Sequence, residues 1–220
     1  MSNWPTMWRA LLDTQWKWTR GIVLFGVIIG FALPLLSLRA ALGAQTDATF
    51  IAAMQGWSIG YAIVAAGLGL LVGLVAWSWD HRLRHVYALS LPIERWRYVL
   101  LRFAAGVVLL TLPALGLLVG AEIVTYSSFV PKTLHAYPIA LTLRFAFATL
   151  VAYAIFFAVS SSTGRTAGYI LWAIGLAIVG QVVLNSLGSQ IDILGRLTGI
   201  VFAAPGLLAV FSGRWMLVDV

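Results

Sequence analysis

Six apolar stretches, each long enough to cross a lipid bilayer as a helix, constrain this chain more than any other feature. They fall at residues 21–38, 58–79, 99–121, 138–159, 168–184 and 194–211. Within a bilayer only helices and closed barrels satisfy every backbone hydrogen bond, and these stretches lack the short alternating pattern of barrel strands. The sequence therefore predicts an all-α, polytopic membrane protein with about six transmembrane helices.

The composition indicates a single membrane domain. Of the 220 residues, 61% are hydrophobic and 10% are charged, whereas soluble domains have about 45–50% apolar and about 25% charged residues. A soluble core cannot absorb so much apolar surface. Because six crossings use most of the chain, residues 21–220 are expected to form one six-span domain without a second folded unit.

The basic residues predict the orientation, because cytoplasmic connections are enriched in Lys and Arg. With the N-terminus inside, ten of them fall on the cytoplasmic side: Arg9, Lys17, Arg20, Arg82, Arg84, Arg95, Arg97, Arg102, Arg165 and Arg214. Four fall outside or in the outer half: Arg39, Lys132, Arg144 and Arg196. Both termini are therefore expected in the cytoplasm, with the protein in the inner membrane. This topology also explains the net charge of +7 without nucleic-acid binding.

Residues 1–20 are predicted to form an amphipathic helix on the cytoplasmic leaflet. Charged side chains recur at helical spacing, namely Arg9, Asp13, Lys17 and Arg20. Another side carries Trp8, Leu11, Leu12 and Trp16. Such a helix places indole rings at headgroup depth and cations outward. It is either a structural arm or a simple interfacial anchor, and its interleaved charges do not match a cleaved signal peptide.

Small residues four positions apart recur in the apolar stretches, where they permit close approach of two helices. The pairs are Gly26 and Gly30, Gly69 and Gly73, Gly116 and Gly120, and Ala173 and Ala177.

The sequence offers little for catalysis or cofactor binding. Lys17 and Lys132 are its lysines, and neither follows the glycine-rich pattern of a phosphate-binding loop. His81 and His85 could share a helix face, but two arginines between them disfavour a metal cation. No G-x-S-x-G elbow accompanies the serines at 160–162 and 186. We therefore expect no catalytic residue, cofactor or metal on this chain.

Two ionisable residues, Glu122 and Arg144, fall in the outer half of the predicted membrane region. Charges within a membrane are costly and are candidates for function. Consecutive antiparallel spans would bring the two to similar depth, so an ion pair between them is one hypothesis. In the alternative, Arg144 extends outward and Glu122 lies in the water of the headgroup layer.

The connection WDHRLRHVYALSLPIERWRYVLLRF, residues 79–103, is too long and too patterned for a simple turn. Pro92 is suited to the start of a helix, and Glu94 would complement the positive end of that helix's dipole. Arg95, Arg97 and Arg102 then lead into the third apolar stretch.

This connection resembles the loop between the second and third spans in membrane subunits of type-2 ABC exporters. The matching residues are Asp80, Leu91, Pro92, Glu94, Arg95, Tyr98, Val99, Leu100 and Arg102. The match is partial, since the family commonly has a small residue where Glu94 stands. The amphipathic N-terminal helix, six spans and cytoplasmic termini are also similar to the family layout.

The resemblance implies that the connection docks onto a separate ATP-binding subunit, which would hold ATP and Mg. The docking residues would be Arg82, Arg84, Pro92, Glu94, Arg95 and Arg97. It also implies a second permease copy or a paralogous permease, and a segment near residues 185–196 that dips back into the membrane. The alternatives are a substrate-capturing component of a vitamin importer, which would not need the long connection, an intramembrane hydrolase, and a scaffold without a transport role.

Overall fold

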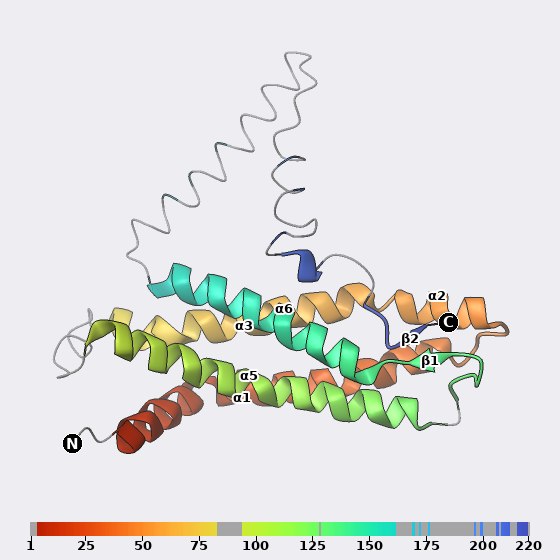
Figure 1. The fold of residues 1–220 in the computed structure, drawn as a ribbon, viewed down its shortest axis with the longest axis horizontal. Coiled ribbons are helices and arrows are strands. Elements are labelled where there is room, and N and C mark those ends of the chain that lie inside the picture. Colours follow the sequence, from red (N-terminus) through yellow and green to blue (C-terminus); the bar gives the residue numbers. More distant parts are fainter. Residues whose placement is uncertain are drawn as a thin grey trace, which may run out of the picture.

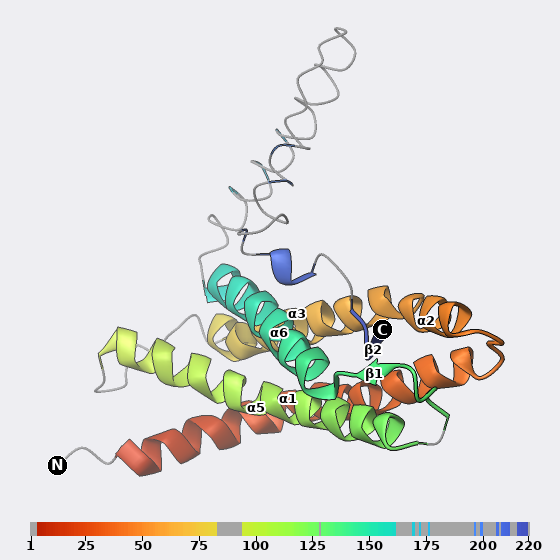
Figure 2. The ribbon, with the colours of Figure 1, turned by 45° about the vertical axis from the view of Figure 1, so that its right-hand side comes forward.

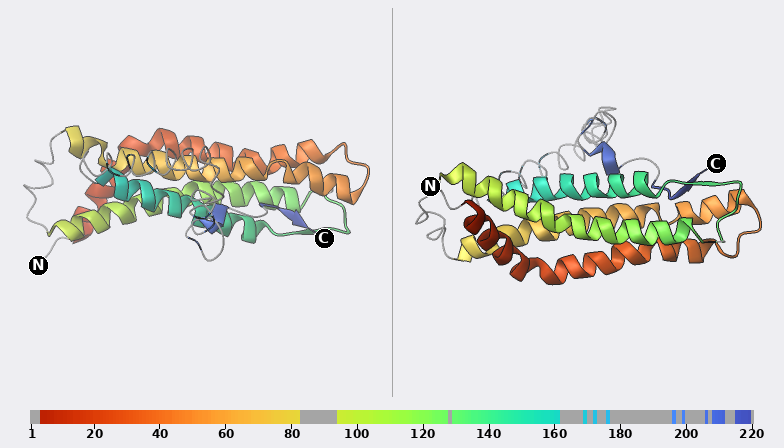
Figure 3. Two further views of the ribbon diagram at one scale, coloured as in Figure 1. Left: turned by 90° about the horizontal axis from the view of Figure 1, so that it is seen from above. Right: turned by 60° about the horizontal axis from the view of Figure 1, so that its bottom comes forward.

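The computed structural model describes residues 4–82, 94–127 and 129–161, together with residues 169, 172, 176, 196, 199, 206, 208–211 and 215–219. Four long helices lie side by side (Figure 1; Figure 3). They are α1 (Trp4–Ala41), α3 (Ser58–Arg82), α5 (Arg95–Thr125) and α6 (Pro138–Ser161). Each contains one of the first four predicted apolar stretches. The stretches at 168–184 and 194–211 lie largely outside the described residues.

All four long helices are long and apolar enough to cross a membrane. Their most apolar windows have mean hydropathies of 1.9 to 2.5. Large apolar side chains also remain on the outside of the bundle, as Phe25, Ile28 and Leu115 illustrate. In water such a surface would be costly, whereas lipid chains cover it without penalty. The described residues therefore form a mostly helical, multi-pass membrane protein.

Helix α1 joins the predicted amphipathic segment and the first span without a break. Its 38 residues are about 57 Å long at roughly 1.5 Å per residue, almost twice the thickness of the hydrocarbon layer. Within its first turns Arg9, Asp13 and Lys17 are exposed, as the pattern predicted, but Gln15 and Thr19 are buried. The boundary at residue 20 is thus not a break in structure, and part of residues 1–20 packs into the bundle.

The helices pack as two pairs through the predicted small residues. A Cβ atom on Gly30 would lie 2.8 Å from the Pro113 carbonyl oxygen, and one on Gly120 would lie 2.3 Å from the Phe31 carbonyl oxygen. These glycines bring α1 against α5. A Cβ on Gly69 would lie 2.6 Å from the Thr149 carbonyl oxygen, so α3 packs as closely against α6. Each pair is parallel, and the two pairs run in opposite directions (Figure 2). Ala173 and Ala177 lie outside the described residues.

We call the end of the bundle where α3 ends and α5 begins the connection end. The opposite end is the strand end. At the strand end, short helix α2 (Asp47–Gln55) begins with a capping box between Thr46 and Thr49. There β1 (His135–Ala136) pairs antiparallel with β2 (Val218–Asp219). Neither α2 nor the strand pair was predicted, because both are too short to show a hydrophobic period.

The strand pair places the two ends of the chain far apart. Trp4 begins α1 at the connection end, whereas Val218 and Asp219 lie at the strand end beside the start of α6 (Figure 1). Leu217 and Val218 are buried, and the Leu217 carbonyl accepts a hydrogen bond from the Tyr137 N–H at 2.7 Å. The described residues nearest the two termini thus lie at opposite ends of the bundle, and the expectation that both termini lie in the cytoplasm stays a prediction. The count of basic residues contains no information about a backbone pairing between residues that lie more than 80 positions apart.

Candidate functional site

The predicted docking residues gather at the connection end. Arg82 is the last residue of α3, Arg95 is the first residue of α5, and Glu94 directly precedes it. Arg84 and Pro92 lie outside the described residues. The two helices therefore bring both ends of the charged connection to the same end of the bundle, beside the amphipathic start of α1 (Figure 1).

Glu94 and Arg97 form an ion pair at the surface. The Arg97 Nε lies 2.8 Å from a Glu94 carboxylate oxygen, and the two side chains are 41% and 58% exposed, respectively. The Arg97 guanidinium also lies 5.2 Å from the ring centroid of Trp96. Glu94 makes no side-chain hydrogen bond that caps α5. Exposed ion pairs contribute only about 0–1 kcal/mol to stability. The charges of Glu94 and Arg97 therefore add little to the stability of the fold and remain available for contact with a partner.

A buried polar cluster lies one turn further along α5, and we define it as Gln15, Trp77, Tyr98, Arg102 and Tyr153. Its centre is Arg102, which is only 9% exposed. The guanidinium donates a hydrogen bond to the Tyr98 hydroxyl and lies 5.0 Å from the ring centroid of Trp77. A delocalised guanidinium is suited to an aromatic face, so Trp77 and Tyr98 help to stabilise this buried cation.

Helices α1 and α6 complete the polar cluster. A Cβ on Gly106 would lie within 3 Å of both the Gln15 Nε2 and the Tyr153 hydroxyl oxygen, so these two groups meet at the bare backbone of Gly106. The Tyr153 hydroxyl donates to the Phe103 carbonyl at 3.3 Å. Its ring stacks on the Phe103 ring with centroids 5.1 Å apart. All four long helices therefore contribute to one buried cluster next to the connection end.

The sequence indicated only part of this cluster. Arg102 was singled out as a basic residue leading into the third apolar stretch, whereas Gln15, Trp77 and Tyr153 were not assigned a site. One available signal is the spacing of Gln15 and Thr19, which are four residues apart and share a helix face with Leu11. Two polar residues on an otherwise apolar face indicate contact with polar groups of the bundle.

At the strand end, Arg144 contacts the C-terminal residues. Its Nε donates to the Val210 carbonyl at 3.1 Å, and its guanidinium lies 5.0 Å from the ring centroid of Trp215. Glu122 lies in the last turns of α5. The structure records no ion pair between Glu122 and Arg144 in the described part of the chain. The ion pair and the alternative, in which Arg144 extends outward and Glu122 lies in the headgroup layer, both stay predictions.

The other candidate residues have structural contacts or lie outside the described range. The Ser160 hydroxyl donates to the Gly73 carbonyl at 2.9 Å, and the Ser161 hydroxyl donates to the Ala158 carbonyl at 2.8 Å. His85 and Ser186 lie outside the described residues. Among the residues that the structure describes, no group of three or more His, Cys, Asp or Glu side chains could hold a metal ion.

The chain was compared with protein-family models, curated proteins and solved structures. No protein-family model matches it, and no curated protein and no solved structure is significantly similar to it. The class that the structure defines is therefore a multi-pass helical membrane protein with a charged connection at one end of its bundle.

Proposed function

We propose that this chain is the membrane-spanning permease subunit of an ATP-driven exporter that resembles the type-2 ABC class. A separate subunit would bind ATP and Mg and dock on the connection between α3 and α5. The chain would convert closure of that subunit into a change of access across the membrane. It would make and break no covalent bond itself.

The observation that carries this proposal is the position of the polar cluster. The docking candidates Arg82, Glu94, Arg95 and Arg97 lie at the connection end. Arg102 lies about two turns further along the same helix and contacts Trp77 on α3. A displacement of the start of α5 would therefore also act on α3 and, through Gly106 and its neighbours, on α1 and α6. Packed helices with two discrete arrangements can carry such a movement, because close-packed interfaces resist gradual deformation.

The absence of a phosphate-binding loop in the sequence supports a separate source of energy. Lys17 and Lys132 are the lysines of the chain, and neither follows the glycine pattern that cradles phosphate. The proposal includes six spans in the inner membrane, a cytoplasmic N-terminus, and a second permease copy or a paralogous permease. Six spans require a cytoplasmic C-terminus, whereas a C-terminal segment that stays at the strand end, where Asp219 pairs with His135, requires an odd number of crossings. The side on which the C-terminus lies distinguishes an even from an odd number of crossings.

The proposal is tested by reversing charge at the connection. The wild-type chain is purified in mild detergent from its native host, and any P-loop ATPase that co-purifies with it is identified by mass spectrometry. The same purification is then repeated with Arg84→Glu and Arg95→Glu combined. Because docking surfaces with matched charge lose affinity when one partner is reversed, co-purified ATPase should fall by about tenfold, or ATPase activity should no longer respond to the permease.

The matched control is Arg39→Glu, which reverses an exposed arginine in the last turn of α1 at the strand end. It should leave both readouts at the wild-type value, and membrane insertion should be equal for all variants. Equal binding and equal stimulation by wild type and the double variant would refute docking at this connection. The exposed charged side of residues 1–20 would then be the next surface to test.

A further inference from the structure

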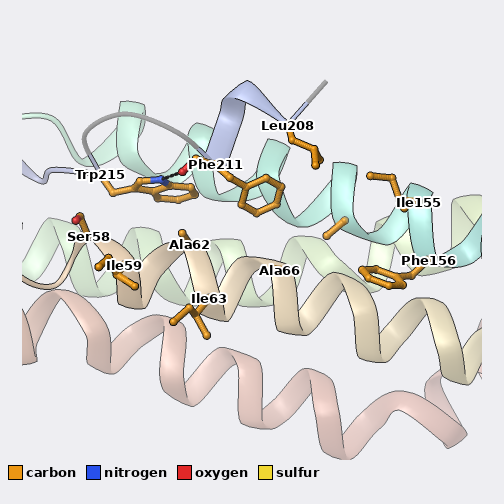
Figure 4. Close-up of a pocket in the computed structure, with 11 residues that line it drawn as sticks. Ser58, Ile59, Ala62, Ile63, Ala66, Ile155, Phe156, Leu208, Phe211 and Trp215 are labelled. Atoms are coloured by element: carbon orange, nitrogen blue, oxygen red, sulfur yellow. Dashed lines mark hydrogen bonds between the residues drawn. The ribbon is translucent and has the colours of Figure 1, made fainter. Parts of the chain in front are cut away.

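An apolar groove runs along the bundle between α3 and α6 (Figure 4). It has a volume of about 550 Å³, within the roughly 300–1,000 Å³ typical of small-molecule sites. Ile59 and Ile63 line it from α3, Ile155 and Phe156 line it from α6, and Phe211 and Trp215 cover it near the strand end (Figure 4). The side chains are almost all apolar, which suits an alkyl chain and disfavours a polar solute.

The groove opens to the outside of the bundle. Ile59 and Ile63 are 69% and 63% exposed even though both line it. Both belong to a helix that is long and apolar enough to span a membrane. An occupant can therefore enter sideways from the surrounding lipid, and one part of it can stay outside the groove.

One polar residue lines the strand end of the groove, and a cation lies beside that end. Ser58 lines it at the first turn of α3, where the helix dipole is positive. Arg144, Ala148 and Ala152 follow one another at four-residue spacing on α6, and Ala152 lines the groove. The Arg144 guanidinium lies 5.0 Å from the ring of Trp215, which also lines the groove. The Arg144 cation therefore lies beside one end of the otherwise apolar groove.

We propose that this groove is a binding site for an anionic phospholipid. One acyl chain lies between α3 and α6, and the phosphate lies at the strand end, where Arg144 attracts it. Guanidinium groups match phosphate geometry through several N–H donors, which makes Arg the preferred residue for such contacts. The second acyl chain remains in the surrounding hydrocarbon, as the lateral opening allows. This inference does not depend on an ATPase partner, so it stands or falls separately from the proposed transport function.

The site is tested by measuring which lipid the purified full chain retains. Phosphatidylglycerol and phosphatidylcholine with identical acyl chains are added at equal concentration in detergent, and bound lipid is counted by native mass spectrometry. The wild type should retain phosphatidylglycerol in preference. Arg144→Gln should reduce that preference by about tenfold, because a charge-assisted contact is lost. Arg39→Gln, which neutralises an exposed arginine at the same end, should not change it.

Filling the groove tests the position of the acyl chain. Ala62→Trp places a large ring among the lining residues, and it should abolish retention of both lipids. Leu115→Trp makes a similar change on the exposed side of α5, away from the groove, and it should retain lipid as the wild type does. Unchanged binding by Ala62→Trp, or an unchanged preference in Arg144→Gln, would overturn the proposal.

A labelling experiment needs no bulky residue and therefore covers the case in which Ala62→Trp does not fold. The chain contains no cysteine, so Ile63→Cys and Leu115→Cys each introduce a single reactive thiol. Added phosphatidylglycerol should slow maleimide labelling at Ile63→Cys severalfold and leave Leu115→Cys unchanged. If labelling at Ile63→Cys slows only with increasing protein concentration, a second copy of the chain covers the groove and the lipid site is refuted.

Discussion

Arg102 and Arg144 lie in opposite halves of the bundle, yet both cations lie 5.0 Å from the centroid of a tryptophan ring. At the connection end, Arg102 is buried, and its partners Tyr98 and Trp77 lie on α5 and α3. At the strand end, Arg144 is half-buried and is held by Val210 and Trp215 from the C-terminal part of the chain.

The difference shows that one sequence feature, an arginine within an apolar helix, serves two structural purposes. Arg102 depends on neighbours within the four-helix bundle, so its environment exists wherever these helices pack. Arg144 depends on residues 66 and 71 positions later in the chain. The connection end is therefore held by the bundle, whereas the strand end is held by a distant segment that returns to it.

The largest expected effect concerns the sides on which the two ends of the bundle lie. Because the chain has no cysteine, single cysteines can be placed by Asp13→Cys, Thr46→Cys and Asp219→Cys. The strand pair predicts that an impermeant maleimide labels Asp219→Cys from the same side as Thr46→Cys, and Asp13→Cys from the other side only. Labelling of Asp219→Cys together with Asp13→Cys would instead support two termini on one side.

Loss of Trp215 should weaken the strand end substantially. Trp215 is 2% exposed and contacts Arg144. Trp215→Ala should lower the free energy of unfolding in detergent by about 3 kcal/mol, because it leaves a cavity and removes a cation–π contact. Trp96→Ala, at an exposed position of the connection end, serves as the control and should cost less than about 1 kcal/mol. Similar losses for both variants would show that the return of the C-terminal segment does not stabilise the bundle.

Replacing Arg102 should destabilise the protein more than replacing Arg144. Arg102→Ala should cost about 2 kcal/mol, because it leaves the buried Tyr98 hydroxyl without its donor and the Trp77 face without its cation. Arg144→Ala should cost about 1 kcal/mol, because its site is only half-buried. Denaturant unfolding of both variants in the same detergent measures the difference. A larger loss for Arg144→Ala would reverse the comparison.

The smallest effects concern ion pairs. A double-mutant cycle with Glu94→Gln and Arg97→Gln should give a coupling of about 0.3–0.5 kcal/mol that falls as salt is added, as expected for an exposed pair three residues apart. The corresponding cycle with Glu122→Gln and Arg144→Gln should be additive within about 0.3 kcal/mol. A coupling above about 1 kcal/mol in the second cycle would restore the ion pair that the sequence suggested.

Much of the helical framework could be predicted from local features. The stretches at 58–79, 99–121 and 138–159 match α3, α5 and α6 within a few residues, because a membrane helix is apolar along its length and each segment has that property alone. The stretch at 21–38 matches only the end of α1, which begins at Trp4. The close approach at Gly30, Gly69 and Gly120 was also predicted, because a missing side chain permits contact whichever helix is the neighbour.

Other features depend on which segments meet. The amphipathic pattern of residues 1–20 correctly indicated exposed charges at Arg9 and Lys17, but it did not indicate that Gln15 would be buried against α5. The possible pair of Glu122 and Arg144 was suggested by depth alone. Depth does not determine the direction in which a side chain points, and the contacts of Arg144 with Val210 and Trp215 were not indicated by the sequence.

Apolar length, charge excess and helical period are sums over neighbouring residues, so the sequence alone established a multi-pass helical membrane protein and the apolar stretches within α1, α3, α5 and α6. The pairing of α1 with α5 and of α3 with α6, the polar cluster around Arg102, and the return of Val218 to Ala136 were decided only in three dimensions. Each requires residues that are 25 to 138 positions apart to fit together. Such contacts depend on the register and direction of packed surfaces, and a pattern within one segment does not contain that information.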